Sequence, residues 1–272
     1  MNIIYQLPFP DEICYKIVLY AFKSPYTDLH DEIFKRAVPT DIYQKLVEKG
    51  KIEIDAQGHI IKANIQSSLN NVELKNIQFD IRFLPRNLAA FSFTNYAWLS
   101  LTPPPRPITG ITGDIKVLQE LQNLTTFFLD CTDVFGDIQA LQGLQHLTKF
   151  DLCMVGVKGD IQVLQELQNL TYFSIQSTGV TGDIQVLRWL QHLTTFNISY
   201  TGVFGDIQVL QSLPKLTQFS LVRTGVLGDI QVLQSLPKLT EFSLESTGVF
   251  GDKEAFQDHR KTHGLKKCRV CM

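Results

Sequence analysis

The stretch Leu193-Thr194-Thr195-Phe196-Asn197-Ile198-Ser199-Tyr200-Thr201-Gly202-Val203-Phe204-Gly205-Asp206-Ile207 is one unit of a repeat that fills about half of the chain. The Gly-Asp pair of this unit recurs every 23 residues, as Gly113-Asp114, Gly136-Asp137, Gly159-Asp160, Gly182-Asp183, Gly205-Asp206, Gly228-Asp229 and Gly251-Asp252. A fixed period of this length is typical of solenoids, in which each unit buries its apolar face against its neighbours. The sequence therefore predicts a stack of coils around one continuous core.

Each unit contains two apolar patterns that predict two kinds of local structure. Phe196 and Ile198 alternate with polar residues, which is typical of a short strand whose apolar side chains face inward. Apolar residues spaced by three then predict a short α or 3₁₀ segment, and in this unit they are Ile207, Leu210, Leu213 and Leu216. Asp206 precedes that segment at the position of a helix N-cap. We expect the strands to stack as one parallel sheet and the helical segments to cover the opposite side.

The unit, written Leu-Thr-x-Phe-x-Leu/Ile-x-x-Thr-Gly-Val, resembles the leucine-rich repeat L-x-x-L-x-L-x-x-N-x-L. The element Gly205-Asp206-Ile207 is similar to the Gly-x-Ile of the plant-type subclass, which also occurs in protists and algae, but the proline that usually follows is missing. The resemblance implies an α/β fold, a leucine-rich-repeat solenoid with its parallel sheet on the concave side and short α or 3₁₀ segments on the convex side. It also implies a non-enzymatic role in protein binding or scaffolding.

The turn after each strand has its own repeated residues. A threonine occupies the place of the family's asparagine ladder, where a side chain hydrogen-bonds the backbone of the turn, in Thr132, Thr178, Thr201, Thr224 and Thr247. Val155 interrupts this series, so we expect a less tightly tied turn there. A glycine follows most of these threonines, which favours a positive φ at that position, and Asp133 replaces it once.

The chain divides at residues 50, 107 and 252. We expect an N-terminal helical cap of three short helices over residues 1–50, and an entry hairpin followed by degenerate repeats over residues 51–107. Regular 23-residue repeats fill residues 108–252. Residues 253–272 predict a C-terminal cap, a helix followed by a last strand in which Cys268 replaces the inward phenylalanine.

The segment Leu7-Pro8-x-Pro10-x-Glu12-Ile13-x-x-x-Ile17 resembles the first helix of an F-box, which joins many leucine-rich repeats to ubiquitin ligase scaffolds. The tryptophan typical of F-boxes is absent from residues 20 to 60. This resemblance implies a substrate receptor of a ubiquitin ligase. The other interpretations are a plain helical cap, which repeat proteins generally require, and a structural subunit of a large assembly.

Composition excludes several classes of function. The net charge is −2 and the sequence pI is about 6.3, so no basic surface for nucleic acid is expected. No apolar run approaches the roughly 18 residues that cross a membrane, and the first residues lack the features of a signal peptide. Five cysteines are an odd number and favour a reducing compartment. The expected location is the cytoplasm.

The sequence contains no pattern for catalysis or for cofactor binding. No Gly-rich phosphate loop, nucleophile with a base, or spaced pair of carboxylates stands out among the repeats. One cluster has the residue types of a zinc site, with two histidines four apart and a C-x-x-C pair: His259, His263, Cys268 and Cys271. The same residues are compatible with a redox-active cysteine pair or with a packed cap that carries free thiols.

Function is therefore expected to lie on a surface that binds a protein. The variable residue of Val-x-Gly-Asp should point outward, and three successive units place a large apolar residue there, namely Phe204, Leu227 and Phe250. Tyr200, Arg223 and Tyr172 are the aromatic and arginine residues expected near or on the strand faces. We predict that these six residues contact the partner. The other interpretation of the apolar three is a packing ladder copied by repeat duplication.

Overall fold

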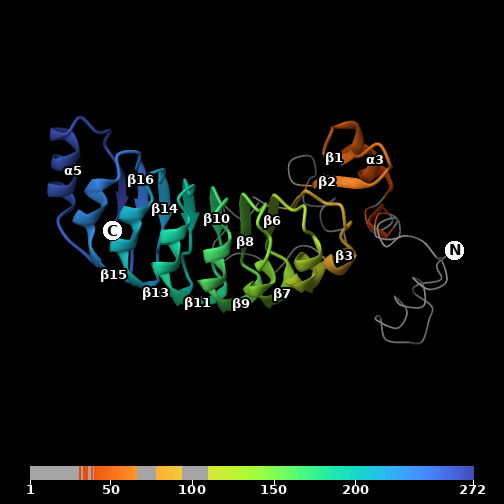
Figure 1. The fold of residues 1–272 in the computed structure, drawn as a ribbon, viewed down its shortest axis with the longest axis horizontal. Coiled ribbons are helices and arrows are strands. Elements are labelled where there is room, and N and C mark those ends of the chain that lie inside the picture. The colour runs from red at the N-terminus through yellow and green to blue at the C-terminus, as the bar shows by residue number, and fades with distance from the viewer. Residues whose placement is uncertain (1–30, 32, 36–37, 39, 66–77, 94–109) are drawn as a thin grey trace.

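The computed structural model of the 272-residue chain describes residues 31, 33–35, 38, 40–65, 78–93 and 110–272. Within these residues the chain forms an elongated stack of coils, with a C-terminal helix at one end and a small hairpin and helix at the other (Figure 1). The first predicted helix, with its F-box resemblance, lies outside the described residues. The degenerate unit at residues 69–77 and the prolines of residues 103–107 also lie outside them.

The first sheet lines one side of the stack and has ten strands among the described residues. Its strands are parallel except for the first pair, and the regular coils pair residues that are 23 apart, such as Phe196 with Phe219. In sheet order the strands are β1 (Ile52–Ile54), β2 (Ile60–Asn64), β4 (Ala90–Phe93), β6 (Thr126–Asp130), β8 (Lys149–Cys153), β10 (Tyr172–Ser174), β12 (Thr195–Asn197), β14 (Gln218–Ser220), β16 (Glu241–Ser243) and β18 (Arg269–Cys271).

A second parallel sheet corrects the expectation of a single one. It has eight strands among the described residues: β3 (Gln78–Asp80), β5 (Gly110–Asp114), β7 (Asp133–Asp137), β9 (Gly156–Asp160), β11 (Gly179–Asp183), β13 (Gly202–Asp206), β15 (Gly225–Asp229) and β17 (Gly248–Phe250). The segment Gly-Val-x-Gly-Asp forms these strands because its valine is buried while its variable residue faces out, for example Val203 and Phe204. From β5 onward, partners in this sheet are 21 residues apart, as when Phe204 pairs with Gly225.

Short helical segments follow the strands of the second sheet, as the spacing of three predicted, and of the two types left open by the sequence they are 3₁₀ helices. They are η2 (Ile81–Phe83), η4 (Ile115–Glu120), η5 (Ile138–Leu141), η6 (Ile161–Glu166), η7 (Ile184–Trp189), η8 (Ile207–Ser212) and η9 (Ile230–Ser235). The aspartate of each Gly-Asp pair up to Asp229 caps one of them, as when Asp206 Oδ1 accepts a hydrogen bond from the Gln208 N–H at 2.8 Å. The predicted capping role of this aspartate is confirmed.

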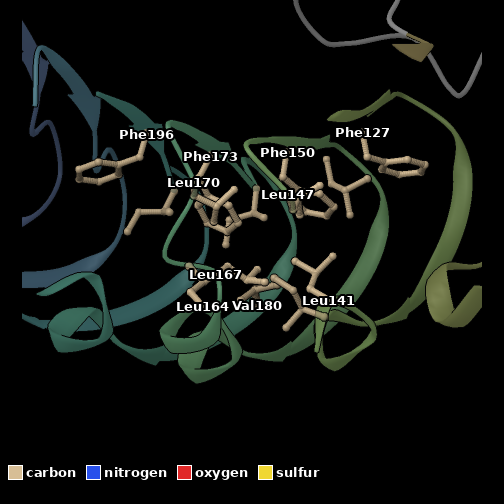
Figure 2. Packing of buried hydrophobic residues seen from close by; sticks show 14 of the residues in the cluster. Phe127, Leu141, Leu147, Phe150, Leu164, Leu167, Leu170, Phe173, Val180 and Phe196 are labelled. Carbon is tan, nitrogen blue, oxygen red and sulfur yellow. The ribbon is translucent and has the colours of Figure 1, made fainter. Parts of the chain in front are cut away.

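The core runs through the whole stack between the first sheet and the 3₁₀ side. Phenylalanines of successive strands stand in one row, and leucines of the 3₁₀ side face them (Figure 2). Phe127, Phe150 and Phe173 are fully buried, with neighbouring ring centroids 6.1 and 6.0 Å apart. Each coil therefore buries its apolar residues against two neighbours, which is how a solenoid gains its stability.

The structure overturns the predicted positive φ of the glycine that follows each threonine. Positive φ occurs one residue before the threonine, as at Tyr200 with φ 57°, and at the glycine of each Gly-Asp pair. The glycine after the threonine is needed for space instead. A Cβ on Gly225 would lie 3.0 Å from Phe204 Cβ of the preceding coil.

The threonine ladder is confirmed in four coils. Each hydroxyl donates to the carbonyl three residues earlier, at 2.6 to 2.7 Å, in Thr178, Thr201, Thr224 and Thr247. Thr132 differs, because its buried Oγ1 has no hydrogen-bond partner among the described residues. Val155 is buried at the same position of its coil.

Replacement of Val155 by threonine is expected to leave the protein equally or slightly more stable. The new hydroxyl would donate to the Leu152 carbonyl, and such a bond contributes about 1 kcal/mol, which offsets the loss of a buried methyl group. The reverse change, Thr201→Val, is the matched control and should cost about 1 kcal/mol. Urea denaturation measures both, and marked destabilisation by Val155→Thr would show that this turn offers no free acceptor.

The C-terminal cap contains the helix α5 (Lys253–Thr262), which begins after the N-cap Asp252 and ends before Gly264, at φ 67°. The strand β18 pairs Val270 with Phe242 of β16. Val270, and not the predicted Cys268, therefore takes the place of the inward phenylalanine. Cys268 is nevertheless buried beneath the cap.

The opposite end has the predicted third helix and hairpin. Helix α3 (Thr40–Glu48) buries Ile42 and Leu46, and β1 and β2 pair in antiparallel fashion. The Asp55 carboxylate closes the hairpin turn by accepting the N–H groups of Gln57 and His59, both at 2.9 Å. None of the described helices has the length and apolar character needed to cross a membrane.

Candidate interaction surfaces

The outer face of the second sheet carries the predicted apolar residues. Phe204 on β13, Leu227 on β15 and Phe250 on β17 are 51%, 53% and 61% exposed, and we call these three residues the outer row. They are not directly side by side as expected, because Leu227 pairs with Asp206 and Phe204 pairs with Gly225. The outer row therefore runs diagonally across the strands, with neighbours about 7–8 Å apart, still within reach of large side chains.

Local geometry explains why the outer row is exposed. Two members stand beside a glycine of the next coil, Phe204 beside Gly225 and Leu227 beside Gly248, and Phe250 lies on the edge strand β17. A glycine has no side chain to cover its neighbour. Thr112, Lys158 and Thr181 occupy the same position in other coils, so the fold does not require an apolar residue there.

Tyr200 and Arg223 lie at the turns that join the two sheets, just before β13 and β15. Both side chains are exposed, and the guanidinium carbon of Arg223 lies 5.4 Å from the ring centroid of Tyr200. A cation held over an aromatic face keeps both side chains in one orientation. The pair thus presents residue types that are enriched at binding hot spots.

Tyr172 lies on a different surface, the exposed face of the first sheet. Its hydroxyl donates to Asp151 Oδ2 of the neighbouring strand at 2.7 Å. Its ring lies 5.6 Å from that of Phe128, measured between centroids, although one strand separates β6 from β10. The prediction that groups Tyr172 with the outer row therefore combines residues of two sheets.

Two carboxyl groups lie beside this aromatic pair, the buried Asp130 and the half-buried Asp151. Burial, and after it the charge of Asp151, raises the pKa of Asp130 to about 8. Burial also raises the pKa of Asp151, although hydrogen bonds from Tyr172 and Ser174 act against the shift. One oxygen of each carboxyl, Oδ1, is buried without a hydrogen-bond partner among the described residues.

No protein-family model matches the chain, and no curated protein matches it in sequence. Solved structures match its fold. The structure named PEPR1-AtPEP1 has a TM-score of 0.53 and 18% identity, covering 72% of this chain and 28% of that one. The leucine-rich-repeat ectodomain of the plant membrane receptor kinase GASSHO1/SCHENGEN3 from Arabidopsis thaliana, in complex with CASPARIAN STRIP INTEGRITY FACTOR 2, has a TM-score of 0.52 and 17% identity, covering 66% and 23%.

The chain has the leucine-rich-repeat fold. It spans about a quarter of the length of both similar structures. The leucine-rich-repeat protein LIC12759 of Leptospira interrogans is also similar, with a TM-score of 0.48 and 16% identity, covering 73% of this chain and 51% of that one. The likeness to the two structures with TM-scores above 0.5 establishes the fold, and at 17% and 18% identity it establishes the fold alone.

A shallow groove crosses the leucine-rich repeats where the 3₁₀ side returns to the first sheet. Its lining residues are His146, Thr148, Asn169, Thr171, His192, Thr194 and Lys215. The threonine hydroxyls donate to carbonyls of the preceding coil, as Thr194 Oγ1 does to the Thr171 carbonyl at 2.8 Å. They therefore serve to tie successive coils together.

The four residues of the zinc pattern do not meet. His259 and His263 stack with ring centroids 4.0 Å apart, whereas Cys268 contacts Gln257, which is two residues from His259 and so on the opposite side of α5. Burial raises the pKa of the Cys268 thiol to about 11, so it is protonated at neutral pH. Throughout the described part of the chain, no group of three or more His, Cys, Asp or Glu residues is placed to hold a metal ion.

Two exposed aromatic residues are absent from the predicted site. Phe135 is 53% exposed at the outer-row position of its coil, but Lys158 and Thr181 separate it from the other three. Trp189 is 47% exposed at the end of η7, with the Arg188 guanidinium carbon 5.2 Å from its ring. The sequence signal for Trp189 is its departure from the other coils, which have Glu120, Gly143, Glu166, Ser212 and Ser235 at this position.

Proposed function

We propose that this chain is a non-enzymatic module that binds a protein partner, and that the outer row makes the central contact. The observation that carries the proposal is the exposure of Phe204, Leu227 and Phe250 on successive strands of one sheet face. Apolar surface of this kind, grouped on one face, usually marks a partner site. The Tyr200 and Arg223 pair adds an aromatic and a cationic group at the strand ends next to the row.

The solved structures of similar fold support a binding role, because they share the fold of this chain. One of the similar structures is an ectodomain in complex with another molecule, as its name states. A scaffolding role uses the same property, because a rigid sheet of stacked coils holds its surface residues in fixed positions.

The test is a triple variant in which Phe204, Leu227 and Phe250 are replaced by threonine, the residue that Thr181 already provides at this position. Because these side chains are more than half exposed, we expect the melting temperature to change by less than about 2 °C, which corresponds to less than about 1 kcal/mol. Copurification of the partner from cells should be lost. The measurements are a thermal melt and quantitative mass spectrometry of the purified complex.

Phe135→Thr is the matched control, since it changes the same position in a coil outside the outer row. It should retain the partner at the wild-type level. Retention of the partner by the triple variant would refute the proposed surface. A large drop in melting temperature would instead show that the outer row is a packing ladder.

A further inference from the structure

The strongest unexplained feature of the first sheet is a group of residues that breaks the repeat. At the position of Phe128 the later coils have Asp151, Ser174, Asn197, Ser220 and Ser243. At the position of Asp130 they have Cys153, Gln176, Ser199, Val222 and Glu245. Other coils have small or neutral residues at both positions. The fold therefore requires neither the aromatic ring of Phe128 nor the buried carboxyl group of Asp130.

These residues come together across three strands. Phe128 on β6 pairs with Asp151 on β8, and β10 with Tyr172 lies on the other side of β8. Because the rings of Phe128 and Tyr172 contact each other, they meet over the middle strand, which carries Asp151. Asp130 lies two residues along β6 from Phe128 and is only 6% exposed.

The arrangement leaves two acceptors without donors. Asp130 Oδ1 and Asp151 Oδ1 are buried and have no hydrogen-bond partner among the described residues, and a buried acceptor without a donor is unfavourable. Lys149 is the cation nearest in sequence, on the same face of β8, but it makes no ion pair with the described residues. A cation supplied from outside would donate hydrogen bonds to both groups, and its charge would favour the ionised form of Asp130 beside Asp151.

The aromatic rings favour one kind of cation. A guanidinium group is planar, so it stacks on an aromatic face, and its five N–H donors can reach two carboxylates at once. An ammonium group is a compact and more strongly hydrated charge without this geometry. We propose that Phe128, Tyr172, Asp130 and Asp151 form a binding site for the arginine side chain of a protein partner. The site lies on the first sheet and is independent of the outer row.

Titration with acetyl-Gly-Arg-Gly-amide, followed by NMR of backbone amides and aspartate carboxyl carbons, tests the site directly. We expect saturable shifts confined to β6, β8 and β10, and a change of the Asp130 carboxyl signal toward its ionised form at pH 7. The same peptide with citrulline, which has the shape of arginine without its charge, should cause no such shifts. The lysine peptide should bind at least threefold more weakly than the arginine peptide.

Asp130→Asn and Asp151→Asn should each weaken binding of the arginine peptide at least fivefold. Glu245→Gln is the matched control, because it removes an exposed carboxylate at the Asp130 position of another coil and should leave the affinity unchanged. Equal shifts from the citrulline peptide would overturn the proposal. Binding of the arginine peptide by both asparagine variants with the affinity of the wild type would also overturn it. If a variant fails to fold, the comparison of the arginine, citrulline and lysine peptides on the wild-type chain decides the question.

Discussion

Arg260→Met is expected to destabilise the C-terminal cap by about 3 kcal/mol, because three backbone carbonyls would lose their donors. The Arg260 side chain is 1% exposed, and its NH1 and NH2 groups donate to the carbonyls of Leu236 and Leu239 at 3.1 and 2.6 Å. Its Nε donates to the Lys266 carbonyl at 2.9 Å. One side chain thus joins the last coil, the cap helix and the segment before β18.

The lower stability of Arg260→Met should appear first as local opening of the C-terminal cap, since a terminal coil has only one neighbour. Hydrogen exchange should become about 100-fold faster for the amides of α5 and β18 than in the wild type, while the middle coils keep their protection. Arg260→Lys should behave similarly, because a single ammonium group cannot replace the planar fork that reaches three carbonyls.

Arg269→Met is the control from the same cap. Its side chain is 76% exposed and makes one ion pair with Glu241 at 3.2 Å, so a change of less than about 1 kcal/mol is expected. If Arg260→Met were as mild as Arg269→Met, the cap would be held by apolar packing alone, for instance by the buried Phe256 against Phe242.

Gly205→Ala is expected to lower the free energy of unfolding by about 4 kcal/mol. Gly205 has a φ of 116°, which is strained for any residue with a side chain, and this strain costs about 1–3 kcal/mol. Its new Cβ would lie 2.5 Å from Asp183 Oδ1 of the preceding coil. That oxygen accepts the Gln185 N–H at 2.9 Å, so displacing it would also remove the cap of η7, worth about 1 kcal/mol.

Gly143→Ala is the control that introduces backbone strain without a steric clash of the new Cβ. Gly143 also has a positive φ, of 82°, but nothing lies within 4 Å of the Cβ it would gain. This control should cost about 1 kcal/mol. Urea denaturation followed by circular dichroism measures both variants, and similar costs for the two would show that the contact between Gly205 and Asp183 is unimportant.

The repeated Gly-Asp pair illustrates what could be read from sequence and what could not. The 23-residue period predicts the solenoid, and the position of Asp206 before an apolar segment predicts its capping role; both are confirmed. The repeat pattern predicts a positive φ at the glycine that follows the threonine, and that prediction is wrong. Positive φ belongs to Gly205 and to Tyr200, while Gly202 and Gly225 give space to the neighbouring coil.

The candidate surfaces also have features that the sequence predicts and features that it does not. Alternation along a strand was sufficient to predict that Phe204, Leu227 and Phe250 face outward, because it depends only on neighbouring residues. Their diagonal arrangement could not be predicted, because it depends on the register between coils. In the regular coils the first sheet pairs residues 23 apart and the second pairs residues 21 apart, although both are built from the same repeat.

The sequence by itself determined the coil, the strands of the first sheet, the short helical segments and the inward phenylalanines, since each follows from spacing within a single 23-residue unit. Only the tertiary structure decided the second sheet and its register, the meeting of Phe128 with Tyr172 over Asp151, and the contacts of Arg260 with the last coil. The physical reason is that these features are contacts between different coils. They depend on how the backbones are offset and how close they approach, which a pattern within one unit does not specify.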